Sequence, residues 1–409
     1  MIAGVSHICN VLGYYLEDGK KMPMEGELTY RGISVKSLAN SFITEKRFGY
    51  EETAYLLMFG EQPNRSKLED FKSLLVEYRS LPQRFTEDMI LSAPSRDVMN
   101  KLERSVLALY SYDDSPEPSC IEKELHQAIK LIARTPLVVA HAFAAKKHYF
   151  DNDSLYLHRP QDNLSLSENF LYSIRGDTKF TAEEAHLLDL CLVLHMDHGG
   201  GNNSTFSCRV LSSTGTDIYS AVAAAVGALK GPRHGGANKK VMEMFSYIKR
   251  DVSDWKDDDE LYHYLVKILN GQTGDNSGLI YGMGHAIYTL SDPRTEILKR
   301  VARSLAESRG MTAEFDLFES VERLSPKVFA DQRGWTKAIC ANVDMYSGLV
   351  YSMLGIPEEL YTPLFAMARV VGWCTHRIEE LYNQTNKIIR PAYSVIEDRK
   401  PFVPIDKRI

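Results

Sequence analysis

Apolar residues recur at three- and four-residue spacing in most segments longer than ten residues. Leu68, Phe71, Leu74 and Leu75 show this pattern, which places side chains on one face of a helix. The alternation typical of strands is weak and is confined to about residues 14–30, where turn residues interrupt it. The pattern therefore predicts a mainly helical protein.

One helix is delimited by signals at both of its ends. Thr181 and Glu184 have the spacing of a capping box, and the leucine-rich run that follows them stops at three consecutive glycines. We therefore expect a helix over residues 180–196. It would deliver His195 and His198 to its C-terminal end.

Two other segments have compositions that indicate helices. Residues 217–229 are rich in alanine, as expected for a buried helix whose neighbours approach closely. The acidic run at residues 257–260 is most simply a solvated turn and helix start, because carboxylates are favoured near a helix N-terminus.

Composition and charge restrict the classes of partner. The 409 residues are 44% hydrophobic and 25% charged, which is typical of a globular protein with a sizeable core. The formal net charge is −6, with acidic and basic residues interspersed, so the surface offers no general attraction for nucleic acid or an anionic membrane. An anionic substrate must then be captured by a local basic cluster.

The cysteines and the N-terminus favour a cytoplasmic location. Six cysteines are scattered without CxxC or zinc-finger spacing, which favours reduced thiols. The N-terminus lacks the basic region of a secretory signal. No run approaches the roughly 20 apolar residues that span a bilayer, so we expect no membrane association.

Four segments place histidine or aspartate among glycines, where loops and helix ends expose side chains to a cleft. These segments are residues 195–202, 230–238, 281–288 and 341–348, and their central side chains are His198, His234, His285 and Asp344. The third segment is soon followed by Pro293, which sets a helix start beside Arg294.

Each segment also has a purely structural explanation. His195 and His198 have HxxH spacing, but a third and a fourth metal ligand are not evident, so we expect contact with an anionic substrate and no metal site. His234 could be a turn residue that faces solvent, and Asp344 could cap a helix. Considered singly, none of them requires a catalytic role.

Considered together, these residues suggest removal of a proton beside a carbonyl. A carboxylate does this poorly unless a second group hydrogen-bonds the oxygen where enolate charge develops, and a neutral histidine is suited to that task. A second histidine is then free to activate the other reactant. Arg294, Arg369 and Arg390 are candidates to hold carboxylates through their guanidinium forks, with surface ion pairs as the alternative.

In this order and at these separations, the four segments resemble the citrate synthase family. Residues 363–373 and 387–391 resemble its last two substrate-binding segments, so the match covers most of the chain. The resemblance implies an acyltransferase that condenses acetyl-CoA with oxaloacetate and water, through an enolate and citryl-CoA, to give citrate and CoA. It implies acetyl-CoA as a co-substrate and no tightly bound cofactor.

The resemblance also assigns a role to each residue. Asp344 would remove a methyl proton from acetyl-CoA, His234 would hydrogen-bond the thioester oxygen, and His285 would polarise the carbonyl of oxaloacetate. The residues expected to hold oxaloacetate are His198, Arg294, Arg369 and, from the neighbouring subunit of a homodimer, Arg390.

The fold implied by the resemblance is all-α, with two domains and the active site in the cleft between them. A large domain would comprise residues 1–235 and 356–409, and a small domain of residues 236–355 would be inserted between its two parts. Closure of the cleft over oxaloacetate would exclude water and complete the acyl-CoA site.

The sequence departs from the family pattern where the CoA phosphates are expected. Many relatives have a basic residue directly after the histidine that matches His285, or four positions after it. Here those positions are Ala286 and Thr289. The cations left as candidates to bind the CoA phosphates are Arg233, Lys239, Lys240 and Lys299.

Two alternative functions stay open. A 2-methylcitrate synthase would use propionyl-CoA with the same residues, and one methylene discriminates between substrates by only about 1 to 3 kcal/mol. A non-catalytic regulator that binds CoA or a dicarboxylate would keep the fold. Such a regulator has no physical need for His234, His285 and Asp344 together.

Overall fold

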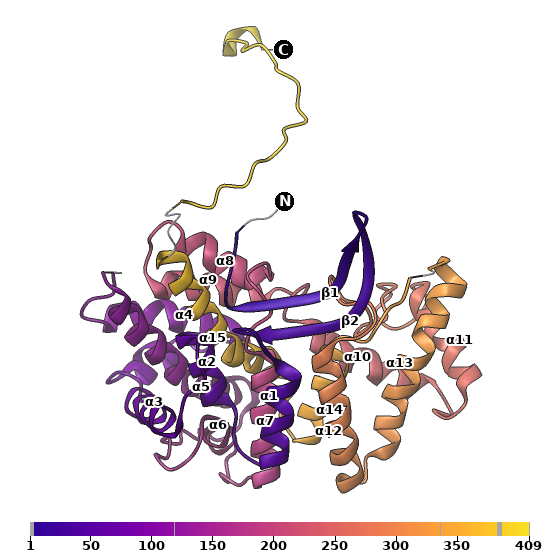
Figure 1. The fold of residues 1–409 in the computed structure, drawn as a ribbon, viewed down its shortest axis with the longest axis horizontal. Helices are drawn as coiled ribbons and strands as arrows, with labels where there is room; N and C mark the ends of the chain where they lie inside the picture. The colour runs from indigo at the N-terminus through magenta and orange to yellow at the C-terminus, as the bar shows by residue number, and fades with distance from the viewer. Residues whose placement is uncertain (1–3, 118, 336, 383–386, 409) are drawn as a thin grey trace.

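The computed structural model describes residues 4–117, 119–335, 337–382 and 387–408. Helices form nearly all of the body, as the apolar spacing predicts, and a single β-hairpin lies across one side of it (Figure 1). The predicted all-α fold class is confirmed.

The elements have the following bounds. The strands are β1 (Cys9–Glu17), β2 (Lys20–Tyr30) and β3 (Ile33–Ser34). The helices of the first half are α1 (Val35–Glu45), α2 (Tyr50–Phe59), α3 (Arg65–Tyr78), α4 (Val98–Ala108), α5 (Ile121–Asp151), α6 (Leu166–Ile174), α7 (Ala182–His195), α8 (Asn203–Ser212) and α9 (Ile218–Lys230). The later helices are α10 (Ala237–Asp251), α11 (Asp258–Leu269), α12 (Pro293–Arg309), α13 (Thr312–Arg333), α14 (Asp344–Met353) and α15 (Tyr361–Tyr382). Short helical turns occur at η1 (Thr86–Leu91), η2 (Leu109–Tyr112), η3 (Glu358–Leu360) and η4 (Ile405–Lys407).

The hairpin is longer than the weak alternation indicates. β1 pairs antiparallel with β2 through a two-residue turn in which Asp18 and Gly19 both have positive φ, the geometry that matches the twist of a hairpin. Between the pairs Leu12–Glu27 and Tyr14–Pro23 the register shifts, so residues 24–26 of β2 lie opposite Gly13 alone and β2 bulges. This irregularity explains why period-two alternation is hard to detect in the sequence.

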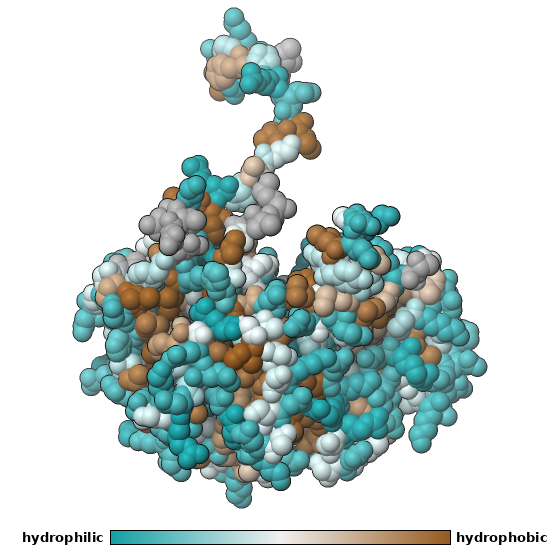
Figure 2. All heavy atoms as spheres, in the orientation of Figure 1, coloured by the Kyte–Doolittle hydropathy of each residue, from teal (hydrophilic) through white to brown (hydrophobic). Residues whose placement is uncertain are grey.

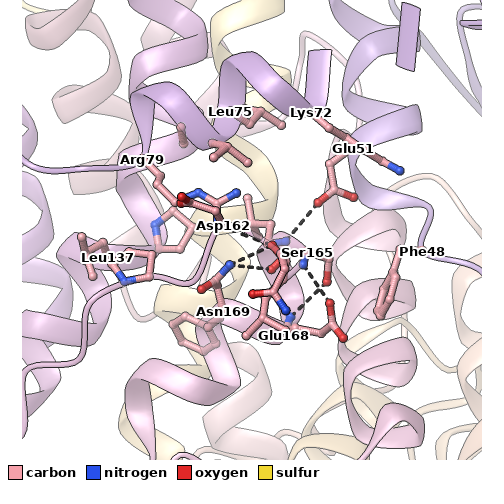
Figure 3. Close-up of a pocket in the computed structure, with 18 of the residues that line it drawn as sticks. Phe48, Glu51, Lys72, Leu75, Arg79, Leu137, Asp162, Ser165, Glu168 and Asn169 are labelled. Carbon is pink, nitrogen blue, oxygen red and sulfur yellow. Dashed lines mark hydrogen bonds between the residues drawn. The ribbon is translucent and has the colours of Figure 1, made fainter. Parts of the chain in front are cut away.

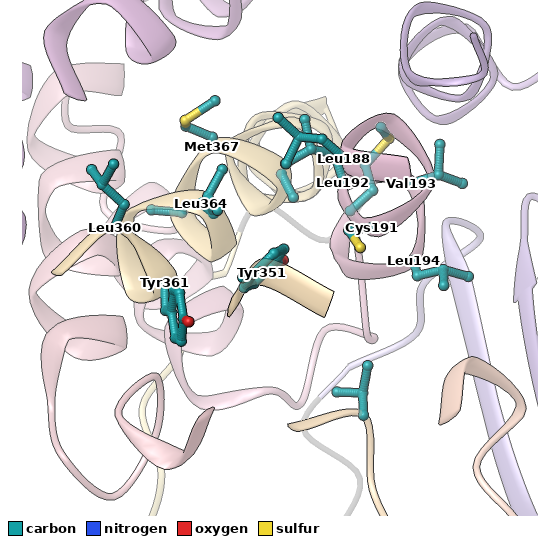
Figure 4. Close-up of a cluster of buried hydrophobic side chains, with 14 of the residues drawn as sticks. Leu188, Cys191, Leu192, Val193, Leu194, Tyr351, Leu360, Tyr361, Leu364 and Met367 are labelled. Carbon is teal, nitrogen blue, oxygen red and sulfur yellow. The ribbon is translucent and has the colours of Figure 1, made fainter. Parts of the chain in front are cut away.

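The centre of the body is formed by α7 against α15. The predicted capping box is confirmed: Thr181 accepts a hydrogen bond from the Glu184 amide at 3.2 Å, and the Glu184 carboxylate accepts one from the Thr181 amide at 2.9 Å. Figure 4 shows Leu188 and Leu192 on the side of α7 that faces α15. Because α7 is buried along its length, its final residue, His195, is held deep inside the protein.

The long helix α5 is a core helix. By length and composition it could cross a membrane, but 83% of its most apolar stretch is buried in the protein. Its neighbours are α3, α4, α6 and α15. The other helices therefore provide the apolar surroundings of α5.

Helices α10 to α14 pack mainly on one another, while α12 also contacts α1 and α7. This arrangement agrees with an inserted unit over residues 236–355. The division into residues 1–235, 236–355 and 356–409 stays a prediction.

The last described segment, residues 387–408, extends away from the body (Figure 1). Its backbone is extended except at η4. In the hydropathy-coloured view, brown side chains of this tail stand clear of the body (Figure 2). The exposed large apolar side chains of the tail are Ile388, Tyr393, Val395, Ile396, Phe402, Val403 and Ile405.

A buried ion pair joins α15 to α5, and its loss should destabilise the fold. Glu124 and Arg377 have no exposed side-chain area, and their oxygen and nitrogen atoms meet at 2.9 and 3.0 Å. We expect Glu124→Ala to lower the free energy of unfolding by about 3 to 5 kcal/mol, because the guanidinium is left buried and unpaired. Denaturant unfolding at a fixed protein concentration measures this.

The matched control for Glu124→Ala is Asp258→Ala, which breaks an exposed ion pair with Arg323. Solvent already screens those two charges, so this change should have little effect on unfolding. Equal losses in the two variants would contradict a structural role for the buried pair.

Candidate active site

Two of the predicted histidines meet edge to face. His198, just beyond α7, and His285, in the segment before α12, have ring centroids 5.1 Å apart. Tyr288 stacks on His285 at 4.6 Å and lies 5.6 Å from His198. Residues 87 positions apart in sequence thus form one aromatic cluster in the interior.

Backbone amides that follow His285 in the chain determine which of its ring nitrogens carries the proton. The amides of Ile287 and Tyr288 both donate to Nδ1 of His285, each at 3.1 Å. An atom that accepts two hydrogen bonds carries no proton, so a neutral ring must hold its proton on Nε2. Burial, followed by the nearby Arg294 charge, lowers the pKa of His285 to about 4. The side chain is therefore a neutral Nε2–H donor at physiological pH.

His198 is a buried neutral histidine without a partner. Its Nε2 is buried and makes no hydrogen bond within the described part of the chain. Burial holds the pKa of His198 well below its usual range, and the positive charges of Arg294 and Arg369 act in the same direction. A buried polar atom of this kind calls for a ligand or a water molecule.

Arg294 lies in the first turn of α12 and is held in place by Asp292. Asp292 caps the helix by accepting from the Arg294 amide at 3.0 Å. The same carboxylate accepts from Nε and from one terminal nitrogen of Arg294, at 3.0 and 2.7 Å. Both side chains are buried, so this guanidinium has a fixed direction and one terminal nitrogen left over.

Arg369, in the middle of α15, is the least satisfied charge of the group. Its side chain has no exposed area, and its Nε donates to the His195 carbonyl at 2.8 Å. Its two terminal nitrogens are buried and have no hydrogen-bond partner among the described residues. The guanidinium lies over the Phe365 ring, 4.7 Å from the centroid. Two parallel N–H donors in a buried position form a receptor for a carboxylate.

A buried polar chain supplies the counter-charge behind Arg369. Arg209 donates to Nδ1 of His376 at 2.9 Å, and the opposite nitrogen of His376 lies 3.0 Å from an oxygen of Asp197. An arginine can only donate, so His376 must present its proton to Asp197. Burial raises the pKa of Asp197, but His376 and Arg369 outweigh it, and the pKa lies below its usual value.

Asp344 is joined to the His285 segment by backbone pairing. Met283 and Ala341 form an antiparallel bridge, and the Asn342 amide donates to the Gly282 carbonyl at 2.8 Å. Asp344 is the first residue of α14, and its side chain makes no capping bond. The capping alternative is therefore wrong for this carboxylate.

The environment of Asp344 makes it a stronger base than an ordinary carboxylate. Burial raises its pKa to about 6, and the Arg294 charge opposes part of that rise. A carboxyl group with this pKa is still ionised at neutral pH and holds a proton more tightly than a solvated one.

His234 lies on the other side of the group, beside the Phe365 ring at 6.4 Å. The Ser204 amide donates to Nε2 of His234 at 3.3 Å, so the neutral ring carries its proton on Nδ1. The Ser204 hydroxyl lies 3.0 Å from the same nitrogen and accepts from the Trp373 indole at 3.2 Å. Burial, with Arg369 second, lowers the pKa of His234 to about 4. The alternative of a solvated turn histidine is wrong.

One predicted residue is not brought to this group. Arg390 is exposed on the extended tail. Within a single chain the cluster therefore contains His198, His234, His285, Arg294, Arg369 and Asp344.

Sequence reasoning missed the residues that orient this cluster: Ser204, Arg209, Asp292 and His376. Asp292 could have been found from its N-cap position before Pro293. The other three carry no local signal, because their partners are about 30 to 180 positions away in the sequence.

The structure also bears on metals and on CoA. The described residues contain no group of three or more histidine, cysteine, aspartate or glutamate side chains that could hold a metal ion. Lys240 and Lys299 are engaged by acidic side chains. Arg233 and Lys239 are exposed and make no ion pair within the described ranges.

A sizeable cavity lies elsewhere, between α3, α5 and α6 (Figure 3). Its volume is about 710 Å³, and none of the predicted site residues lines it. Its floor is apolar, with Leu75, Pro136 and Leu137 among the lining residues. The chemistry of the cluster described above is therefore separate from this cavity.

Comparison with known proteins shows the family of the chain. The family model "Citrate synthase, C-terminal domain" matches residues 1–392. The chain is 35% identical over 391 residues to a citrate synthase of Synechocystis sp., covering 94% of this chain and 89% of that protein. It is 33% identical over 409 residues to 2-methylcitrate synthase 1 of Corynebacterium glutamicum, covering 97% of each.

A solved structure is similar over nearly the whole chain. It is the ternary complex of carboxymethyl coenzyme A and oxaloacetate with citrate synthase from Thermoplasma acidophilum, with a TM-score of 0.80, 27% identity and coverage of 99% of this chain and 97% of that one. The chain belongs to the citrate synthase family, and it is an enzyme of the acyltransferase type.

Proposed function

We propose that this enzyme condenses acetyl-CoA with oxaloacetate and water to give citrate and CoA. The observation that carries the proposal is the buried guanidinium of Arg369, whose two terminal nitrogens, like Nε2 of His198, have no hydrogen-bond partner in the described part of the chain. Buried donors without acceptors are costly unless a ligand supplies the acceptors. A dicarboxylate does so, and it also explains how a protein of net charge −6 captures an anion.

In this proposal the two arginines hold the substrate differently. Arg369 offers a free fork and would bind one carboxylate of oxaloacetate through two hydrogen bonds. Arg294 already uses one side of its guanidinium on Asp292, so it would offer a single remaining nitrogen. His198 would complete the site inside this chain.

His285 would then polarise the ketone of oxaloacetate. Its backbone contacts place the ring proton on Nε2, and its lowered pKa keeps it neutral. A neutral donor stabilises the alkoxide that forms as carbon attacks, and it can give up its proton to that oxygen.

Asp344 and His234 would make the nucleophile. Asp344 takes a methyl proton from acetyl-CoA, and the Nδ1 proton of His234 stabilises the enolate oxygen. The enolate carbon forms a bond to the ketone carbon and gives citryl-CoA. Water then adds to the thioester carbonyl, CoA leaves as the thiol, and citrate is released.

A second candidate is 2-methylcitrate synthesis from propionyl-CoA. It is favoured by the 33% identity to the Corynebacterium 2-methylcitrate synthase, which is close to the 35% identity to the Synechocystis citrate synthase. The same catalytic residues would serve both reactions, since the substrates differ by one methylene.

We also propose that Arg233 and Lys239 contribute to binding the CoA phosphates. Both are exposed beside His234, whereas Lys240 and Lys299 are already neutralised by carboxylates. The CoA analogue in the Thermoplasma ternary complex supports a nucleotide site in relatives of this fold.

We infer a homodimer in which Arg390 completes the site of the neighbouring subunit. The tail that carries Arg390 exposes large apolar side chains such as Tyr393, Val395 and Ile396, with exposed fractions of 89%, 81% and 95%. Apolar side chains in an extended segment gain stability only by packing on another surface. A second copy of the chain provides that surface, and the free cysteines agree with a reducing, cytoplasmic location.

The proposed function is tested by release of CoA thiol from acetyl-CoA and from propionyl-CoA in the presence of oxaloacetate. We expect a higher kcat/KM with acetyl-CoA, while the reverse order would identify a 2-methylcitrate synthase. Oxaloacetate binding by calorimetry without thiol release from either substrate would favour the non-catalytic regulator.

Asp344→Asn is the matched variant for this assay. We expect kcat to fall by about 10² to 10⁴, the usual contribution of a general base, while oxaloacetate affinity changes little because Asp344 acts on the other substrate. Comparable losses in both quantities would contradict this assignment.

The pH dependence of the reaction should report Asp344. Its pKa is raised to about 6, so the base loses activity as pH falls through about 6 and below. Bound oxaloacetate adds negative charge, which can only raise the pKa of Asp344 and move the acid limb of the pH profile to higher pH. We expect the acid limb of kcat/KM near or above pH 6, well before the histidines charge near pH 4. A limb centred near pH 4 would exclude Asp344 with its raised pKa as the base.

Sharing of the site can be tested by subunit mixing. A subunit with Arg390→Ala and a subunit with Asp344→Asn are each inactive in their own homodimers. In a mixed dimer, one site receives an intact Arg390 and an intact Asp344, so about half of the sites gain both groups if Arg390 crosses the interface. Absence of activity in verified mixed dimers would show that the residues act within one chain.

A further inference from the structure

The β1–β2 hairpin contacts the segment before His198 and the segment after His285. At one end, the Tyr30 hydroxyl lies 3.1 Å from the Val193 carbonyl and 3.2 Å from the Asp197 carbonyl, and it accepts from the Asp197 amide at 3.3 Å. These contacts tie the hairpin to the residues directly before His198. The strands then run across the molecule towards α12 (Figure 1).

In its middle, the hairpin lies backbone against backbone on the segment that follows His285. A Cβ atom on Gly13 would be 2.4 Å from the Ile287 carbonyl oxygen and 2.9 Å from the Tyr288 Cα. Neither distance can be relieved by turning a side chain, because both contacts are with main-chain atoms. Gly13 lies opposite the bulge that residues 24–26 form in β2, so both glycines of the contact belong to the irregular part of the hairpin.

The second strand makes a similar contact from Gly26. A Cβ atom there would be 2.1 Å from the Ser291 carbonyl oxygen and 3.0 Å from Cδ of Pro293. The Gly26 amide donates to the Ser291 hydroxyl at 3.2 Å. Both glycines have φ outside the left-handed region, so closeness alone, and not backbone conformation, requires glycine here.

The segment under the hairpin is the one that sets the proton of His285. The amides of Ile287 and Tyr288 hold Nδ1 of that ring, and Tyr288 stacks on it. If the segment moved away by an ångström, Nδ1 would lose its two donors and the ring could take its proton on either nitrogen.

We propose that Gly13 and Gly26 are positioning residues for the reaction: through them the hairpin clamps residues 287–291 and keeps His285 as an Nε2–H donor facing the ketone. The inference rests on the proposed role of His285 in polarising oxaloacetate. The hairpin itself touches no reacting atom, and its contribution passes through the backbone of the clamped segment.

The test compares Gly13→Ala and Gly26→Ala with two controls. Gly4→Ala is the same chemical change at a position with nothing within 4 Å of the added carbon. Glu27→Ala changes an exposed side chain of β2 directly after Gly26. The measurements are kcat, oxaloacetate affinity by calorimetry, and the infrared stretching frequency of the ketone in bound oxaloacetate, which falls when a donor polarises it.

We expect kcat to fall by about tenfold or more in Gly13→Ala and Gly26→Ala, since small misplacements of a catalytic group have large effects on rate. Oxaloacetate affinity should fall much less, because the atoms nearest to Gly13 and Gly26 belong to residues 287–293 and not to Arg369. The ketone frequency should shift towards that of His285→Ala, while both controls keep the wild-type values.

Ser291→Ala keeps the inference testable if the two glycine variants fail to fold. It removes the hydrogen bond from the Gly26 amide without adding an atom, and we expect a severalfold loss of kcat with the same direction of ketone shift and an unchanged Tm. Wild-type kcat and ketone frequency in Ser291→Ala and in whichever glycine variants fold would overturn the inference. A wild-type enzyme that neither releases thiol nor shifts the ketone would instead refute the proposed function.

Discussion

The organisation of the interior depends on a positive charge that is left without an acceptor. Arg369 is fully buried on α15, one nitrogen is spent on the backbone of α7, and two nitrogens are unpaired. Burial of such a group costs several kcal/mol unless neighbouring charge compensates it. Here Asp197, held by His376, provides compensation at a distance and leaves the fork open. The stability of the ligand-free protein and the proposed capture of a dicarboxylate therefore depend on the same arrangement.

The second recurring feature is that main-chain amides determine which nitrogen of His285 and of His234 carries the proton. In His285 the two amides follow the histidine directly in the chain, whereas in His234 the amide comes from Ser204 at the start of α8. Backbone amides cannot titrate or rotate away. Both imidazoles are consequently fixed as neutral donors, with the proton on Nε2 of His285 and on Nδ1 of His234, and neither tautomer depends on the protonation of a neighbouring acid.

Much of this architecture was accessible from the sequence, because local rules determine it. The predicted helix at residues 180–196 is observed as Ala182–His195, and the alanine-rich prediction at 217–229 is observed as Ile218–Lys230. The hairpin was underestimated, since Gly13 and Gly26 break the alternation in order to approach another backbone closely. Contacts between distant segments have no periodic signature. For the same reason the resemblance could indicate the candidate catalytic residues, but it could not predict the distant side chains that orient them.

The short antiparallel bridge between Met283 and Ala341 has a consequence for how this enzyme can change over evolution or in the laboratory. It joins the backbone of the proposed acid, His285, to that of the proposed base, Asp344, since each lies within three residues of the bridge. A substitution that shifts the backbone at residue 341 would therefore also shift the segment that carries His285. Under the proposed roles, a change within the bridge alters the acid and the base together, whereas a change in a side chain outside it can alter one of them alone.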